Sequence, residues 1–171
     1  MQLHRLAWTD HHWLPALATL LQDTVDTGAS VGFLAPLEAD EARTYWQDVL
    51  ANLDDRFQLW IAEDNGHLLG TVQLACCGKA NGRHRAEVQK LMVATAARGR
   101  GIARLLMDTV ETQARASGIT LLVLDTQKGS TAERVYARLG WTRAGEIPDF
   151  ALLPHGGLAA TVLFWKRLET A

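Results

Sequence analysis

The spacing of apolar residues in the first third of the chain predicts a strand followed by two helices. Residues 3–8 alternate enough in polarity to form a strand. Helical spacing follows in one segment that begins near Asp10 and in another that begins near Glu38. Their inward positions are Leu14, Leu17, Ala18, Leu21 and Val25 in the first helix, and Ala42, Trp46, Val49, Leu50 and Leu53 in the second. The apolar connection at residues 27–37 is expected to form a lid with both helices.

Three strand-like segments come next. Residues 57–63 and 68–76 are joined by Asp64-Asn65-Gly66-His67, in which Asn-Gly is a strong signal for a hairpin turn. Residues 85–93 return as a third strand. The sequence therefore predicts an antiparallel meander.

The central stretch, residues 87–118, predicts a strand, a short loop and a helix. Residues 88–93 are largely apolar and lack Gly and Pro, which suits a buried strand. Residues 96–101 contain two arginines and two glycines. Helical spacing follows, and Gly118 is a stop signal. The inward positions of this helix are Ile102, Leu105, Leu106, Val110 and Ala114.

The continuous apolar run at residues 119–125 predicts a buried strand parallel to the preceding one, because a helix separates the two. Ser130-x-x-Glu133 is a capping-box signature, and it opens a helix that stops at Gly140. We expect this helix to turn Ala132, Val135 and Leu139 inward.

Residues 141–147 and 161–165 predict the last two strands, separated by a connection at residues 148–157. The fold class is α/β, of the three-layer α+β kind. It comprises a mixed central sheet of about seven strands, with an N-terminal antiparallel meander, a βαβ unit and about four helices. At 171 residues the chain is expected to form a single domain, residues 1–171.

Composition restricts the classes of partner. The 17 Lys and Arg against 19 Asp and Glu give a net charge of -2, so no overall basic field favours nucleic acid. Adjacent Cys76 and Cys77 imply neither a disulfide framework nor a zinc site. No apolar run approaches the roughly 20 residues of a membrane span, and the first residues do not read as a leader. We expect a cytoplasmic protein without metal, either a monomer or a homodimer.

The loop at residues 96–101 predicts an anion site. Its glycines allow the backbone to approach a ligand closely, and free amides at a helix N-terminus favour phosphate. A nicotinamide dinucleotide would need a third glycine where Arg104 stands and a different arrangement of strands upstream. The other candidate ligand for this loop is coenzyme A.

The segment Arg98-x-x-Gly101-x-Ala103, which follows Leu91-Met92-Val93, resembles the acetyl-CoA signature of the GCN5-related N-acetyltransferases (GNAT). The order of the elements and the late helix with Tyr136 resemble this family across essentially the whole chain. The resemblance implies the GNAT fold and acetyl-CoA as co-substrate. It also implies these cofactor contacts: Leu91, Met92, Val93, Arg98, Gly99, Arg100, Gly101, Ile102 and Ala103. The family often has Asn before the late helix, where this chain has Gly129 and then Ser130, a further candidate contact.

Acetyl transfer needs a neutral amine, so a carboxylate must take the ammonium proton directly or through water. Glu87 at the start of the central strand and Asp125 at the end of its parallel neighbour are the candidate bases. Either can serve, and both would attract a cationic amine. The competing interpretation is that Glu87 pairs with Arg85 or Lys90, and that Asp125 begins a turn.

Tyr136 is the candidate general acid, since a phenol with a pKa near ~10 can protonate a thiolate whose conjugate acid has a pKa near ~8.5 or above. The resemblance places the family's acid tyrosine at this position. The competing interpretation is that Tyr136 is a half-buried core residue of its helix.

The acceptor pocket is expected to be walled by Val31, Phe33, Trp46, Asp149 and Phe150. This mixture of apolar area and carboxylates suits a small, partly apolar amine. Branches of the family that inactivate toxins and antibiotics suggest a substrate such as a tabtoxinine-type β-lactam. A protein or peptide amine, and a non-catalytic acyl-CoA-binding module, remain as alternatives.

Overall fold

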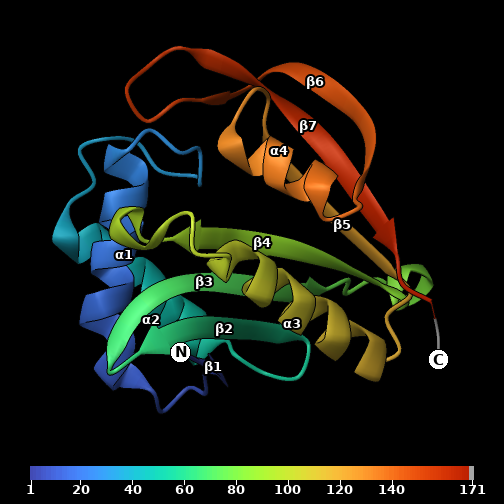
Figure 1. Cartoon of the computed structure of the whole chain (residues 1–171), viewed down its shortest axis with the longest axis horizontal. Coiled ribbons are helices and arrows are strands. Elements are labelled where there is room, and N and C mark those ends of the chain that lie inside the picture. The colour runs from blue at the N-terminus through green and yellow to red at the C-terminus, as the bar shows by residue number, and fades with distance from the viewer. Residues whose placement is uncertain (170–171) are drawn as a thin grey trace.

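The computed structural model describes residues 1–169, which form a seven-stranded mixed sheet flanked by helices (Figure 1). The strands are β1 (Gln2–Arg5), β2 (Phe57–Asp64), β3 (His67–Cys76), β4 (Arg85–Val93), β5 (Leu121–Gln127), β6 (Thr142–Leu152) and β7 (Leu158–Arg167). The helices are α1 (Leu14–Asp26), α2 (Ala39–Ala51), α3 (Ile102–Ala116) and α4 (Thr131–Arg138), with short 3-10 turns η1 (His11–Trp13), η2 (Ala80–Gly82) and η3 (Thr95–Ala97). The strand order is β1-β2-β3-β4-β5-β7-β6, which confirms the predicted mixed sheet.

Helices cover both faces of the sheet and create two cores. α1 and α2 pack on one face, against Leu59 and Ile61 of β2. α3 packs on the other face, against Val72 and Leu74 of β3, and crosses the front of the sheet in Figure 1. Apolar stripes on the helices drive this packing, because burying them removes them from water. The predicted inward face of α1 is buried, as are Ala42, Trp46, Val49 and Leu50 of α2.

The predicted meander is confirmed, since β1 to β4 pair in antiparallel order. The turn between β2 and β3 has φ values of 51° at Asn65 and 80° at Gly66. Two successive positive φ values are what a two-residue hairpin needs to match the twist of its strands, and Asn-Gly accepts them most easily.

β4 and β5 pair in parallel only where each begins. The register runs from Arg85 opposite Leu121 to Glu87 opposite Val123, although β4 continues to Val93. Beyond Glu87 the edge of β4 that faces β5 has no strand partner within residues 1–169. The two strands meet at the right of Figure 1 and diverge toward the left.

β4 also contains a β-bulge opposite β3. One residue of β3, between Thr71 and Gln73, faces two residues of β4, Lys90 and Leu91. Lys90 has a φ of 50°, and its carbonyl oxygen accepts a hydrogen bond of 3.0 Å from Thr71 Oγ1. A bulge bends the strand and changes the direction of its side chains, so it alters which residues of β4 face the ligand side.

The last two strands are longer than predicted. β6 continues to Leu152 and β7 begins at Leu158, so the expected connection at residues 148–157 shortens to residues 153–157. Pro148 and Asp149 suggested a loop, but β6 is an edge strand, where Pro does not break a ladder. The register with β7 shifts between Ile147 and Ala151, which accommodates the irregular residues.

A buried polar network joins α3 to β7. Glu111 is 4% exposed and accepts hydrogen bonds from Trp141 Nε1 at 3.2 Å and Lys166 Nζ at 2.8 Å. Lys166 Nζ also donates to the carbonyl of Leu139 at 2.8 Å. These contacts link the helix that follows β4 to the elements that follow β5, so they connect the two halves of the divergent sheet. Among residues 1–169, no helix has the length and apolarity that a membrane span requires.

Replacing Glu111 by Ala should lower the free energy of unfolding by about 2–4 kcal/mol, because Trp141 and the half-buried Lys166 lose their acceptor. Urea denaturation measures this change. Asp108→Ala is the control, since Asp108 lies exposed on the same helix, 3.8 Å from Arg104, and should cost less than about 0.5 kcal/mol. Equal losses for the two variants would contradict the role of the network.

Candidate active site

A cleft of about 960 Å³ opens where β4 and β5 diverge. It is lined by most of β4 and by segments from five other parts of the chain: the lid connection after α1, the loop and first turn of α3, the end of β5, α4, and the β6–β7 hairpin. The predicted lid connection contributes residues 27–32. The divergence of the sheet therefore creates a single space that elements distant in the sequence share.

The loop that leads into α3 presents a run of free amides. Gly99 and Gly101 have φ values of 78° and 79°, and α3 begins without a side-chain cap or an acidic residue in its first turn. Within residues 1–169, no hydrogen bond uses the N–H groups of residues 99–104, and the first helical bond runs from Leu105 N to Gly101 O at 3.2 Å. Free amides at the positive end of a helix dipole favour anions, so the loop has the geometry that the predicted anion site requires.

The side chains of the loop are less available than its amides. The guanidinium of Arg98 donates to Thr27 Oγ1 at 3.1 Å and to the carbonyl of Val93 at 3.4 Å. Arg100 is exposed and lies outside the cleft. The other predicted cofactor contacts all line the cleft with Arg98: Leu91, Met92, Val93, Gly99, Gly101, Ile102, Ala103 and Ser130.

Both candidate bases line this cleft. Glu87 is half-buried on β4 and forms no hydrogen bond or ion pair within residues 1–169, so the alternative pairing with Arg85 or Lys90 is absent there. Arg85 instead donates to Cys77 Sγ at 3.5 Å. Asp125 is exposed within β5 rather than in a turn, and its carboxylate accepts a hydrogen bond of 2.7 Å from Thr161 Oγ1.

Tyr136 lines the same cleft while packing in the core. It is 6% exposed, and the centroids of Trp141 and Phe164 each lie 6.1 Å from its ring centroid. Its hydroxyl forms no hydrogen bond within residues 1–169, yet it is not among the fully enclosed polar atoms there, so it is accessible from the cleft. Burial, and next the charge of Asp125, raise the pKa of Tyr136 above that of an ordinary phenol.

Tyr136 is therefore the most buried residue of α4. The predicted inward residues Ala132 and Leu139 are partly buried and pack against the same core, and Val135 is partly buried and lines the cleft. The ring of Tyr136 thus packs in the core, as the competing interpretation expects, while its hydroxyl remains accessible.

Residues 10–141 match the family described as the acetyltransferase (GNAT) family. The chain belongs to this family. Solved structures show the same fold over nearly the whole chain. A ribosomal-protein-alanine N-acetyltransferase from Brucella melitensis has a TM-score of 0.80 at 20% identity, covering 98% of this chain and 100% of its own. A GCN5-related N-acetyltransferase from Kribbella flavida has a TM-score of 0.78 at 24% identity, covering 97% and 98%.

A further solved structure contains the cofactor. The yncA protein of Salmonella typhimurium, determined with acetyl-CoA, has a TM-score of 0.77 at 17% identity, covering 99% of this chain and 95% of its own. As a GNAT protein, the chain is an N-acetyltransferase, and acetyl-CoA is its acetyl donor. The family, fold and co-substrate predicted from the segment Arg98-x-x-Gly101-x-Ala103 are thus confirmed.

The predicted acceptor residues divide into two groups. Val31 and Phe150 line the cleft of this GNAT protein. Trp46 does not, because its side chain is fully buried in the core formed by α1 and α2. Phe33 packs edge-on against Tyr45 at 5.2 Å, and Asp149 lies exposed in the irregular part of β6, so neither lines the cleft. The expectation for these last three residues is corrected accordingly.

The lid connection is linked to the β6–β7 hairpin beside the cleft. Ala35 N donates to the carbonyl of Pro154 at 2.9 Å, and His155 Nε2 lies 3.1 Å from the carbonyl of Asp26. Figure 1 shows the turn between β6 and β7 approaching the loop after α1. Arg98 adds a third link through Thr27. The lid thus bridges the hairpin and the anion loop.

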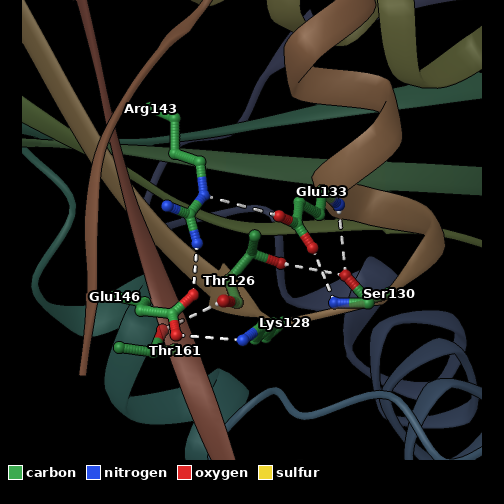
Figure 2. Close-up of polar contacts among 8 residues, drawn as sticks. Thr126, Lys128, Ser130, Glu133, Arg143, Glu146 and Thr161 are labelled. Atoms are coloured by element: carbon green, nitrogen blue, oxygen red, sulfur yellow. Dashed lines mark hydrogen bonds and ion pairs between the residues drawn. The ribbon is translucent and has the colours of Figure 1, made fainter. Parts of the chain in front are cut away.

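A polar network fixes the start of α4 (Figure 2). Ser130 Oγ accepts from Glu133 N at 3.1 Å, which confirms Ser130 as the N-cap. The Glu133 carboxylate accepts from the N–H of Gly129 at 2.6 Å, one residue before the cap, instead of from that of Ser130 as a standard capping box requires. Arg143 of β6 lies 3.8 Å from Glu133 and also pairs with Glu146. The network attaches the first turn of α4 to β6 and so orients the helix that carries Tyr136.

Lys90 is a cleft residue that the sequence did not reveal as one. The sequence indicates only a strand position and a possible partner for Glu87, whereas in the structure Lys90 lines the cleft from the bulge of β4. The signal is tertiary, since the bulge is defined by the pairing of β4 with β3. Thr161 was likewise assigned only to a strand, yet it positions Asp125.

Gly101→Ala should weaken coenzyme A binding roughly tenfold. Alanine is strained at the positive φ of this position, and the backbone shift that relieves the strain would turn the free amides away from their common direction. Isothermal titration calorimetry with coenzyme A measures this. A Cβ at Gly101 would meet nothing within 4 Å, so the effect comes from the backbone alone.

Gly118→Ala is the matched control. Gly118 has a φ of 76° and equally open surroundings, but it lies beyond the far end of the same helix. Both variants should lose about 1 kcal/mol of stability. If they bind coenzyme A equally well, the amides of residues 99–104 are not the anion site.

Proposed function

We propose that this GNAT protein transfers the acetyl group of acetyl-CoA directly to the amine of a small molecule. The observation that carries the proposal is that Glu87, Asp125 and Tyr136 line the same cleft as the free amides of residues 99–104. When bound, acetyl-CoA supplies the activated acetyl thioester. The amides would hold its pyrophosphate, and the unpaired edge of β4 would hold its pantetheine amide.

The proton transfers use a carboxylate as the base and Tyr136 as the acid. Glu87 or Asp125 takes a proton from the ammonium group of the acceptor, directly or through water, so that the nitrogen can attack the thioester carbonyl. The new C–N bond forms as the C–S bond breaks, and Tyr136 donates its proton to the departing sulfur. The proton that the nitrogen releases on becoming the amide returns to the Tyr136 phenolate, directly or through water. The raised pKa of Tyr136 keeps the phenol in the proton-bearing form across the neutral pH range.

The acceptor is a small molecule because the lid and the β6–β7 hairpin are linked beside the cleft. Val31 and Phe150 supply apolar area beside the carboxylates. The segments 28–33, 81–93, 97–101, 124–126 and 129–136 resemble the tabtoxin resistance acetyltransferase, which supports a toxin or antibiotic such as a tabtoxinine-type β-lactam.

A thiol-release assay across amine classes tests this function. We expect the kcat/KM for at least one small amine, among β-lactam toxins, aminoglycosides and amino acids, to exceed that for peptides with a free N-terminus by tenfold or more. Preference for the peptides would contradict the small-molecule acceptor. Coenzyme A binding without thiol release for any amine would instead indicate a non-catalytic acyl-CoA-binding module.

Tyr136→Phe should lower kcat by roughly 10²-fold or more, because the leaving sulfur loses its proton donor. Coenzyme A affinity and stability should change little, since the hydroxyl forms no hydrogen bond within residues 1–169. Steady-state kinetics and calorimetry measure the two effects.

The pH profile gives a second readout for Tyr136. A raised pKa leaves the donor form intact until the pH rises through that value, so ionisation of Tyr136 should cause no decline in kcat between pH 7 and about 10. Unchanged turnover in Tyr136→Phe, or a decline near neutral pH that this variant abolishes, would remove Tyr136 from the role of acid.

A further inference from the structure

Lys90 occupies an unusual backbone position. Its φ of 50° lies in the left-handed region, which side chains such as that of Lys rarely adopt. The β-bulge and the hydrogen bond from Thr71 Oγ1 to its carbonyl hold it there. Residues kept in such conformations by their surroundings cluster at ligand sites, and here the conformation lies on the strand that lines the cleft.

The ammonium group of Lys90 lies near an aromatic ring and the backbone of the lid. Nζ stands 5.6 Å from the centroid of the Tyr45 ring, and a Cβ atom at Gly32 would lie 3.6 Å from it. The Tyr45 ring is held in place by a hydrogen bond of 3.2 Å from Gln73 Nε2 and by edge-on packing of Phe33 at 5.2 Å. The aromatic face and the lid backbone thus fix the cation at one place beside the cleft.

This cation has no anionic partner of its own. Lys90 is half-buried, and within residues 1–169 Nζ forms neither a hydrogen bond nor an ion pair. Burial lowers the pKa of Lys90, while the charges of Asp125 and Glu87 act in the opposite direction without contact. A desolvated ammonium with unused donors is costly unless an oxyanion approaches it.

The side chains that line the cleft therefore carry charges of both signs. Glu87 and Asp125 provide two negative groups, and Lys90 provides a positive group that lines the same space. An amine that also carries an oxyanion can satisfy both signs at once, whereas a simple amine leaves Lys90 unpaired. The apolar contacts of Val31 and Phe150 remain available to the rest of such a molecule.

We propose that the acceptor is an amine that carries a carboxylate or a similar oxyanion, and that Lys90 binds this oxyanion while Glu87 and Asp125 face the amine. The inference rests on the proposed function and specifies its substrate class. The acceptor is thus of the amino-acid type. The distance between its amine and its oxyanion must match the distance from the carboxylates of Glu87 and Asp125 to the ammonium of Lys90.

Paired acceptors test the inference. The kcat/KM of thiol release is measured for common amino acids and for their carboxamides, with wild-type protein, Lys90→Met, Lys90→Arg and the control Lys79→Met. Met retains an apolar chain over Tyr45, and Lys79 is exposed outside the cleft. Each result is a carboxylate-to-carboxamide ratio, and comparing ratios between variants removes the intrinsic difference in amine reactivity.

We expect the ratio to fall at least tenfold in Lys90→Met, mainly through KM, to persist largely in Lys90→Arg and to stay unchanged in Lys79→Met. An equal ratio in Lys90→Met and wild-type protein overturns the inference, since Lys90 would then only balance the charges of Glu87 and Asp125. Acetylation restricted to amines without an anion also overturns it but preserves the proposed function. Absence of thiol release with every amine overturns both.

Wild-type protein alone gives a second measurement, which does not depend on the folding of any variant. N-acetyl amino acids should inhibit competitively with the acceptor at least tenfold more strongly than the corresponding N-acetyl amino acid amides. Equal inhibition by the two series overturns the proposal.

Discussion

The structure depends on the loss of pairing between β4 and β5 after Glu87 and Val123. A parallel pair that continued to Val93 would close the sheet and fill the cleft with backbone. The divergence instead leaves one edge of β4 without a strand partner within residues 1–169, and such polar groups need water or a ligand. The buried network around Glu111 connects the elements on the two sides, so the opening does not divide the core.

The polar groups that line the cleft differ between the start of α3 and the strands β4 and β5. At the start of α3 the donors are backbone amides, which suit a phosphate because they are numerous and rigidly directed. On β4 and β5 the charges are side chains of both signs, those of Glu87, Lys90 and Asp125. Tyr136 lies on the wall shared by these regions, and its burial among aromatic rings favours the neutral phenol.

Much of the site follows from local pattern. The hairpin at Asn65-Gly66, the strand at residues 85–93, the loop with Gly99 and Gly101, and the N-cap at Ser130 each depend on residues close in sequence. Other features did not follow. Pro148 marked a loop by its local chemistry, but the ladder with β7 extends β6 past it. Trp46 was expected to supply apolar area to the pocket wall, yet helix packing encloses it.

The sequence by itself determined the types of the elements, the position of the anion loop and the family of this acetyltransferase, because helix spacing, turn chemistry and the signature from Arg98 to Ala103 act over a few neighbouring residues. Only the tertiary structure decided where β4 and β5 separate, how deeply Tyr136 of α4 is buried and where the side chain of Lys90 lies. The physical reason is that these features arise from pairing and packing between distant segments. A bulge opposite β3 has no counterpart in the spacing of apolar residues along β4.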